Sequence, residues 1–376
     1  MQQKIHPRTG RVFHRSILSE DWYLWDNYGY SDGGTIHIYS QAADKVSCAV
    51  PEERFSRAYW RHFTSQDNGL TWRDEGPVFS AQGEADAFDS KTIWSGSVIQ
   101  RPDGRVVAAY TGLQRGSLAR QSMAMALSTD GYRFDRVDPR RPLLSPLLDY
   151  DELQSKGYYL GPRETIGDTE QEEDGTFLCF RDPFLFLDEA GRTHLFFAAK
   201  ARQGDRIVGA LGHALFTDEA QLRDLEILPP RFVPDAGDFN LLELPNVFLR
   251  HDVYYLVIST SVLEYFGQPD EQAQKSVRIY RSASLDGPWM PYGSEGNHVL
   301  LRPESKLHGL NIVNGSERGQ DTITCRAFWV GDAWLPPSIY LTVGGRKPEL
   351  RFPDSLWMPD EKPVRIHPDA GSEVDI

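Results

Sequence analysis

The sequence predicts an all-β fold: a single-domain, five-bladed β-propeller with a funnel at its centre. Three observations lead to this prediction, namely the many aromatic, glycine and proline residues, the short strand-like runs, and a turn pattern that repeats along the chain. Aromatic residues make up 12% of the 376 residues, which also include 32 Gly and 24 Pro. Aromatic side chains suit half-buried pleated surfaces, while Gly and Pro mark the turns between strands.

The strand-like runs are short and bounded by turn residues, and almost no stretch has the i, i+3, i+4 apolar spacing of an amphipathic helix. Many short strands with regular turn signals are typical of sandwiches, barrels and propellers. A large β-sandwich, or a pair of them, is therefore the alternative to a propeller. Examples of these runs are residues 35–39, 106–110, 193–197, 254–258 and 338–342.

A turn that combines Asp and Gly with a following aromatic residue occurs three times, at Asp67, Asp130 and Asp286, with a weaker copy near Asp218. Asp and Gly favour tight turns, and the aromatic residue can pack back onto the sheet. The separations of 63 and 156 residues fit a unit of about 60–80 residues, which divides the chain into about five blades. We assign residues 1–358 to the propeller and residues 359–376 to a C-terminal tail.

Charge and composition exclude several classes of function. The chain has 40 Lys and Arg against 54 Asp and Glu, a net charge of −14, whereas a nucleic-acid-binding face needs excess cation. No apolar run approaches the roughly 18 residues of a membrane span. We therefore expect neither nucleic acid nor a membrane as a partner. The odd number of cysteines argues against a disulfide framework, and with no leader-like segment at the N-terminus it favours the cytoplasm.

Motifs for other chemistries are missing from the sequence. We find no nucleophile elbow, no P-loop, no zinc-protease helix and no dinucleotide-binding glycine motif. The ten histidines are scattered without metal-ligand spacing. We therefore expect no cofactor and no metal at the site, while the spacing leaves open a calcium ion held by loop oxygens.

Three acidic residues have unusually apolar and aromatic neighbours: Asp26, Asp182 and Glu243. An unpaired buried carboxylate is costly, so each must be paired, hydrogen-bonded or functional, and Arg181 is an obvious local partner. On three separate blades they would meet in the central funnel. Carboxylates among aromatic rings suit glycoside hydrolysis, in which one acts as nucleophile or base and another as acid. We expect desolvation among the surrounding leucines to favour the neutral form of Glu243.

Four motifs occur in a characteristic order: Trp25-Asp26, Trp94-Ser95-Gly96-Ser97, Phe180-Arg181-Asp182-Pro183, and Glu243 followed by Asn246-Val-Phe248. In this order they resemble glycoside hydrolase family 68, the levansucrases and inulosucrases, and its relatives, the invertases of family 32. The resemblance covers roughly residues 20–330. Family 32 usually adds a C-terminal β-sandwich, for which this chain has no room, so family 68, a bare five-bladed propeller, fits better.

The resemblance implies a retaining enzyme that cleaves a β-fructofuranoside, as hydrolase or transferase, through a covalent fructosyl-enzyme intermediate. Asp26 would be the nucleophile, Asp182 would stabilise the transition state, and Glu243 would be the general acid/base. The sugar pocket would be shaped by Trp25, Trp94, Ser95 and Arg181.

Two departures from the family 68 pattern affect the leaving-group side. The family usually has Glu two residues before the acid/base and Arg directly after it, and this chain has Leu241 and Leu244 there. We expect an apolar wall at these positions, which would make sucrose a poorer donor than a fructoside with a less hydrophilic aglycone. In the alternative, the loop around residues 264–266 supplies polar contacts and sucrose is the ordinary substrate.

Two rival functions remain open at this point. Family 43 arabinanases and xylosidases are also five-bladed and use two Asp and one Glu, but they invert the anomeric centre, which requires a wider separation of the carboxylates. The second rival is a propeller that binds carbohydrate but catalyses no reaction. Carboxylates that fail to converge would favour this second rival.

Overall fold

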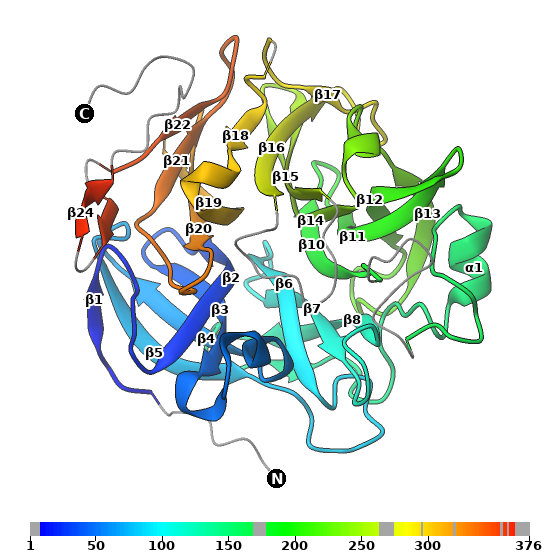
Figure 1. Ribbon diagram of the computed structural model, residues 1–376, viewed down its shortest axis with the longest axis horizontal. Coiled ribbons are helices and arrows are strands. Elements are labelled where there is room, and N and C mark those ends of the chain that lie inside the picture. Colours follow the sequence, from blue (N-terminus) through cyan, green and yellow to red (C-terminus); the bar gives the residue numbers. More distant parts are fainter. Residues whose placement is uncertain are drawn as a thin grey trace.

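The computed structural model describes residues 8–167, 178–262, 274–294, 296–318, 321–353, 356–358 and 361–364. Within these ranges the protein is almost entirely β-structure, with one short helix, α1 (Tyr150–Ser155). The larger sheets lie around a common centre, and the strands Trp22–Ser31, Thr92–Gln100, Arg181–Leu187, Leu241–Arg250 and Leu307–Arg318 lie nearest to it (Figure 1). The predicted all-β fold is confirmed. Short 3₁₀ turns are formed by Lys45–Ser47, Pro51–Ser56, Ala236–Asp238 and Pro303–Ser305.

Neighbouring strands run antiparallel and follow one another in chain order within each group. The first group contains β2 (Trp22–Ser31), β3 (Ile36–Asp44), β4 (Tyr59–Ser65) and β5 (Thr71–Phe79), with β1 (Val12–His14) on the outer edge of β5. The second contains β6 (Thr92–Gln100), β7 (Val106–Leu113), β8 (Gln121–Ser128) and β9 (Asp135–Arg136). The third contains β10 (Arg181–Leu187), β11 (Thr193–Gln203), β12 (Arg206–Phe216) and β13 (Leu225–Arg231).

The remaining strands continue this pattern. The fourth group contains β14 (Leu241–Arg250), β15 (Val253–Val262), β16 (Gln274–Ser282) and β17 (Met290–Pro291), and β18 (Val299–Leu301) also pairs with β16. The last contains β19 (Leu307–Arg318), β20 (Thr322–Trp329), β21 (Ile339–Thr342) and β22 (Glu349–Arg351). β23 (Leu356–Met358) and β24 (Glu361–Val364) pair with each other.

One parallel contact joins the last group to the first. Gly29 and Tyr30 of β2 pair with Val313 and Asn314 of β19, so that these two groups form a single nine-stranded sheet. This contact brings the two ends of the chain's β-structure together (Figure 1). Since β2 carries Asp26, the last strands of the chain help to position a predicted catalytic residue.

Buried hydrophobic clusters fill the spaces between neighbouring groups of strands. The cluster between the first and second groups includes Tyr39 and Tyr110, and the cluster between the first and last includes Trp72 and Val313. Two further clusters connect the second group to the third and the third to the fourth and last. Each group therefore buries both of its faces, which is why so many strands read as continuous apolar runs.

The repeated turns lie at equivalent places, between the third and fourth strands of their groups. Asp67 lies between β4 and β5, Asp130 between β8 and β9, Asp218 between β12 and β13, and Asp286 between β16 and β17. Position 131 has no room for a side chain, because a Cβ on Gly131 would lie 2.6 Å from the hydroxyl of Tyr30. The aromatic residues that follow three of these turns are all buried, as predicted: Trp72, Phe134 and Trp289.

Three further expectations concern segments and side chains outside the site. All three cysteines are free, as expected. No helix within the described residues is long and apolar enough to cross a membrane. The predicted tail, residues 359–376, lies outside the described residues except for β24, so its boundary stays a prediction.

Candidate active site

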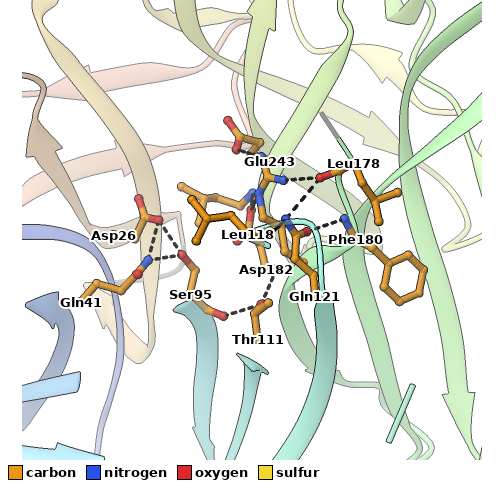
Figure 2. A network of polar contacts seen from close by, with 12 residues as sticks. Asp26, Gln41, Ser95, Thr111, Leu118, Gln121, Leu178, Phe180, Asp182 and Glu243 are labelled. Carbon is orange, nitrogen blue, oxygen red and sulfur yellow. Dashed lines mark hydrogen bonds and ion pairs between the residues drawn. The ribbon is translucent and has the colours of Figure 1, made fainter. Parts of the chain in front are cut away.

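The three predicted carboxylates all lie on first strands, at breaks in the antiparallel register. The breaks occur at Asp26 in β2, at Asp182 in β10 and directly after Glu243 in β14. A bulge turns a side chain away from the regular alternation of a strand and is common beside active sites. Figure 2 shows the three side chains around one shared space, each from a different group of strands. The structure therefore brings the three predicted residues together.

Two backbone positions at this site have left-handed conformations that non-glycine residues rarely adopt. Asp182 has φ +56° and Leu244, directly after Glu243, has φ +50°. Such conformations cost about 1–3 kcal/mol and cluster at functional sites. Here they are held by hydrogen bonds: the amide of Asp182 donates to Thr111 Oγ1 at 3.0 Å, and the amide of Leu244 donates to Asp182 Oδ2 at 3.2 Å.

Asp26 is held by two polar side chains from other strands. The Ser95 hydroxyl donates to Asp26 Oδ2 at 2.5 Å, and Gln41 Nε2 donates to the same oxygen at 2.9 Å and to Ser95 Oγ at 2.6 Å. Burial raises the pKa of Asp26, while the Ser95 hydrogen bond and the positive charge of His308 oppose this rise. Both hydrogen bonds go to Oδ2 and hold the carboxylate in one orientation, as a nucleophile requires.

Asp182 shares its surroundings with both other carboxylates. Burial raises its pKa, the guanidinium of Arg181 lowers it, and the negative charges of Glu243 and Asp26 raise it further. Arg181 Nε lies 3.9 Å from Asp182 Oδ2, so this ion pair is loose. The pKa of Asp182 therefore depends on the charge state of both other carboxylates.

Glu243 differs from the sequence-based expectation. Burial does raise its pKa, as predicted, but the charges of Arg181 and His308 outweigh burial and hold this pKa well below its usual range. Arg181 Nη2 donates to Glu243 Oε1 at 2.6 Å, and His308 Nε2 lies 3.8 Å from Oε2. The expectation that the neutral form is favoured is therefore wrong for the free protein, because Arg181 pairs with Glu243 rather than with its sequence neighbour.

The two predicted tryptophans have different surroundings. Trp25 is only 3% exposed and packs edge-on against Phe55, at 6.0 Å between ring centroids. Trp94 is partly exposed, its Nε1 donates to the Phe55 carbonyl oxygen at 2.6 Å, and the guanidinium of Arg181 lies 5.9 Å from its ring centroid. Trp94 thus offers an aromatic surface at the site, and Trp25 supports Phe55 from behind.

The two leucines that replace the usual family 68 residues do not form the expected apolar wall. Leu241 is fully buried with Cys179 and Ala198, and Leu244 is 6% exposed. Leu241 belongs to this small buried cluster, and Leu244 lies within the register break that follows Glu243 in β14. The alternative loop around residues 264–266 lies outside the described residues.

Sequence reasoning missed several residues that support the carboxylates. Thr111 Oγ1 donates to the Ser95 carbonyl oxygen at 3.0 Å, linking Ser95 to Asp182 (Figure 2). Gln121 Oε1 accepts from the Phe180 amide at 3.0 Å, just before Arg181. Ser95 lies at a register break in β6, and His308 lies directly before one in β19. Such breaks mark site residues, but they become visible only when the pairing partners of each strand are known. The missed residues are Gln41, Thr111, Gln121, Lys275 and His308.

Within the described ranges, no group of three or more His, Cys, Asp or Glu side chains is arranged to hold a metal ion. The polar groups of the site are instead paired with one another through hydrogen bonds and ion pairs (Figure 2). This arrangement suits proton transfer and nucleophilic attack by carboxylates, with aromatic and cationic groups beside them.

Comparisons with known proteins concern one segment of the chain and the fold as a whole. Residues 46–156 match the family model of the glycosyl hydrolases family 32 N-terminal domain, a segment that includes Trp94 and Ser95 but none of the three carboxylates. No curated protein sequence matches the chain.

Solved structures share the fold over most of the chain. The inulosucrase from Halalkalicoccus jeotgali bound to kestose has a TM-score of 0.61 and 18% identity, covering 93% of this chain and 92% of that one. Bacillus subtilis levansucrase has a TM-score of 0.61 and 15% identity, covering 96% and 91%. A levansucrase variant complexed with sucrose has a TM-score of 0.60 and 16% identity, covering 92% and 88%. The fold is that of these propeller enzymes rather than a β-sandwich, and the resemblance to glycoside hydrolases of families 32 and 68 is confirmed.

Proposed function

We propose that the protein is a retaining glycoside hydrolase or fructosyltransferase that cleaves a β-fructofuranoside. The observation that carries this proposal is the convergence of Asp26, Asp182 and Glu243 at register breaks of three first strands. The family 32 match and the shared fold with levansucrases and an inulosucrase support the same chemistry. The sugars named with those structures, kestose and sucrose, suggest the substrate class, an oligosaccharide that ends in a fructosyl unit.

The proposed reaction has two steps. In the first, Asp26 attacks the anomeric carbon of the fructosyl unit while Glu243 gives its proton to the departing glycosidic oxygen. Asp182 accepts hydrogen bonds from fructosyl hydroxyls and stabilises the positive charge that develops on the ring. In the second step, Glu243 takes a proton from water or a sugar hydroxyl, which attacks the fructosyl-enzyme ester and releases Asp26.

The ionised state of Glu243 in the free protein places a condition on this reaction. Glu243 must gain a proton before the first step, against the charge of Arg181 that lies 2.6 Å away. A bound sugar displaces water and shields this pair, and desolvation favours the neutral carboxyl group. We infer that substrate binding and proton uptake by Glu243 are coupled.

The five-bladed count is part of this proposal. Five first strands, namely β2, β6, β10, β14 and β19, each begin an antiparallel group and each have a register break toward the site. The far ends of the same five strands line a cavity of about 430 Å³, with Tyr30, Gln100, Leu187, Leu249 and Asn314 among its residues. The five strands thus surround one axis, with their register breaks at one end and this cavity at the other. This arrangement supports one blade for each of the five strands.

The decisive experiment separates hydrolysis, transfer and simple binding. Purified protein is incubated with sucrose, raffinose, inulin and levan, and free fructose and glucose are quantified separately. With methanol as acceptor, proton NMR of the first-formed methyl fructoside reports whether the anomeric configuration is retained. Retention supports the proposal, and inversion would support a family 43-like mechanism.

Variants tie this activity to the site. Asp26→Asn and Glu243→Gln remove the two reacting groups, while Asp103→Asn changes an exposed turn residue that bonds to Arg105 and serves as the matched control. The proposal expects turnover to vanish in the first two variants and to persist in the third. Sugar binding by wild-type protein with no turnover of any fructoside would instead identify a carbohydrate-binding propeller.

A further inference from the structure

We propose that His308 is a positioning residue that holds the proton-carrying oxygen of Glu243 and sets how readily that proton is released. The inference deepens the proposed function and rests on its assignment of Glu243 as the general acid/base. It concerns a residue on the last group of strands, outside the four motifs quoted above for the family resemblance.

The two oxygens of Glu243 face different partners. Oε1 accepts a hydrogen bond from Arg181 Nη2 at 2.6 Å, and Oε2 lies 3.8 Å from His308 Nε2. An arginine keeps its proton at all ordinary pH values, so Oε1 stays an acceptor. The proton that Glu243 transfers must therefore be carried by Oε2, the oxygen beside His308.

The fold holds the His308 ring in this place. The side chain is 3% exposed and packs edge-on against Phe328, with 5.7 Å between ring centroids. The next residue, Gly309, has φ +64°, and a Cβ there would lie 3.0 Å from the Leu244 side chain. β19 breaks register directly after His308, so this strand presents the imidazole toward the site in the way that β2, β10 and β14 present their carboxylates.

The surroundings of the His308 ring indicate which of its two nitrogens carries the hydrogen. His308 Nδ1 is buried and has no hydrogen-bond partner among the described residues. The hydrogen of a neutral imidazole sits on the nitrogen that has an acceptor, so we assign it to Nε2, facing Glu243. An N–H group at this position favours the carboxylate over the carboxylic acid, in the neutral ring and more strongly in the charged ring.

Other charges also act on Glu243, and they stay in place when His308 is replaced. Arg181 and Lys275 also lower the pKa of Glu243, and both remain in a His308 variant, so a change at His308 isolates the contribution of His308. His308 also lowers the pKa of Asp26, where burial is the largest influence. The titratable and charged groups that act on Glu243 or feel its charge are Arg181 and Asp182 of β10, Lys275 of β16, Asp26 of β2 and the neighbouring Cys179 thiol.

The proposal has a signature that a packing role lacks. Without His308, the pKa values of Glu243 and Asp26 both rise. The first step needs Asp26 ionised and Glu243 protonated, so the acidic and the basic limbs of the kcat/KM profile both move to higher pH. A packing defect would lower kcat at every pH and leave the limbs where they are.

The test replaces the ring in two ways and measures the carboxyl group directly. His308→Phe keeps an aromatic ring without a donor, and His308→Gln keeps an N–H donor without a titratable charge. The Glu243 carboxyl carbon is followed by ¹³C NMR across pH, assigned by its loss in Glu243→Gln. We expect its pKa to rise by about one unit in His308→Phe and by less in His308→Gln.

Controls and outcomes separate this inference from the proposed function. His251→Gln changes an exposed histidine at the other end of the Glu243 strand and should leave the titration unchanged. If His308→Phe does not fold, as judged by circular dichroism, His308→Gln carries the test. An unshifted Glu243 titration in a folded His308 variant overturns the inference whether or not the protein has turnover. Absence of fructoside turnover in the wild-type protein refutes the proposed function alone.

Discussion

The Ser95 hydroxyl donates a 2.5 Å hydrogen bond to Oδ2 of Asp26, across the boundary between two neighbouring groups of strands. Ser95 is 1% exposed and lies at the register break of β6, as Asp26 lies at that of β2. The contact links the orientation of the proposed nucleophile to its ionisation. Hydrogen bonds to a charged group are worth about 1.5–3 kcal/mol, more than those between neutral groups.

Replacing Ser95 should make the nucleophile harder to ionise. Burial already raises the pKa of Asp26, and the Ser95 hydrogen bond opposes it. In Ser95→Ala this pKa rises further, so Asp26 stays protonated to a higher pH. Because the pKa of Glu243 lies below that of Asp26 in the free protein, the basic limb of kcat/KM reports Asp26 and moves up by about one pH unit. Profiles of wild-type protein, Ser95→Ala and Ser95→Cys check this, with the weakly donating thiol between the other two. Superimposable basic limbs would contradict the assignment.

The nucleophile and the acid/base should respond differently to the leaving group. Asp26→Asn and Glu243→Gln each lower turnover of ordinary fructosides, with general acid catalysis alone contributing about 10²–10⁴-fold. An aryl fructoside with an acidic phenol leaves without a proton, so it partly restores the first step in Glu243→Gln and not in Asp26→Asn. Pre-steady-state release of the phenol measures this step. Equal rescue of both variants, or of neither, would refute these roles.

Sucrose should be a poorer donor than an aryl fructoside. A glucosyl unit needs several polar partners, each worth about 1–3 kcal/mol when buried, and this chain has Leu at the two positions where family 68 usually has Glu and Arg. We expect kcat/KM for sucrose below about 10⁴ M⁻¹s⁻¹. Steady-state kinetics on both donors decide it, and a higher value for sucrose than for the aryl fructoside would count against the prediction.

Introducing Arg at position 244, as in family 68, should not restore the turnover of sucrose. Leu244 is buried and lies close to Gly309, so Leu244→Arg would force a charged side chain into packed surroundings. Overpacking costs about 1–3 kcal/mol, which lowers Tm by about 1–4 °C for a chain of this length. Differential scanning fluorimetry and sucrose kinetics measure both effects, and a stable variant with improved sucrose turnover would show that Leu244 can face the leaving group.

Two buried arginines should contribute oppositely to stability. Arg61 is fully buried and bonds to both oxygens of Asp74, at 2.8 and 2.7 Å. Arg326 is also fully buried, yet its Nε and Nη2 have no hydrogen-bond partner within the described ranges, and burial lowers its pKa to about 9. Arg61→Met leaves the buried carboxylate of Asp74 without its cationic partner and should cost about 3–5 kcal/mol. Arg326→Met should be neutral or stabilising, because Met can still pack on Trp72. Urea unfolding of the two variants checks the contrast.

The protein should lose stability in acid through buried histidines. His194 Nδ1 and His213 Nε2 are 3.0 Å apart, and burial lowers the pKa of both, that of His213 to about 3. Between the unfolded value of about 6.5 and the folded value, the unfolded chain binds a proton that the folded chain does not. The free energy of unfolding therefore falls as pH drops through this window, by up to about 1.4 kcal/mol per pH unit for each such histidine.

A pair of variants isolates this contribution. His213→Gln keeps an N–H group near His194 without titrating and should flatten the dependence of unfolding free energy on pH between about 6.5 and 3. His14→Gln changes an exposed histidine and should leave it as in the wild-type protein. Chemical unfolding at several pH values measures both, and an unaltered slope in His213→Gln would show that acid acts elsewhere.

The sequence predicted the features that depend on short-range patterns. Turn residues such as Asp67 and Asp286 act locally, so their repeats marked equivalent turns before any pairing was known. Asp26, Asp182 and Glu243 stood out because each is a charge in an apolar run, which always needs an explanation.

Features that depend on strand register were missed. His308 reaches Glu243 because β19 breaks register after it, and Gln41 reaches Asp26 from the neighbouring strand β3. The pKa of Glu243 was predicted from its leucine neighbours in sequence, but Arg181, 62 residues away, together with His308 and Lys275 outweighs the effect of burial on it. Burial can be estimated from neighbouring residues, whereas an ion pair between strands depends on which strands meet.

The pairing of β2 with β19 also has a consequence for how the protein is made. Gly29 and Val313 are 284 residues apart, so this contact cannot form on the ribosome until nearly the whole chain has emerged. Contacts between distant residues are slow to form because a long loop must close first. The strand that carries Asp26 is thus completed last, and a nascent or truncated chain has no assembled catalytic centre. Activity that depends on Asp26 should therefore appear only once this closing contact between β2 and β19 has formed.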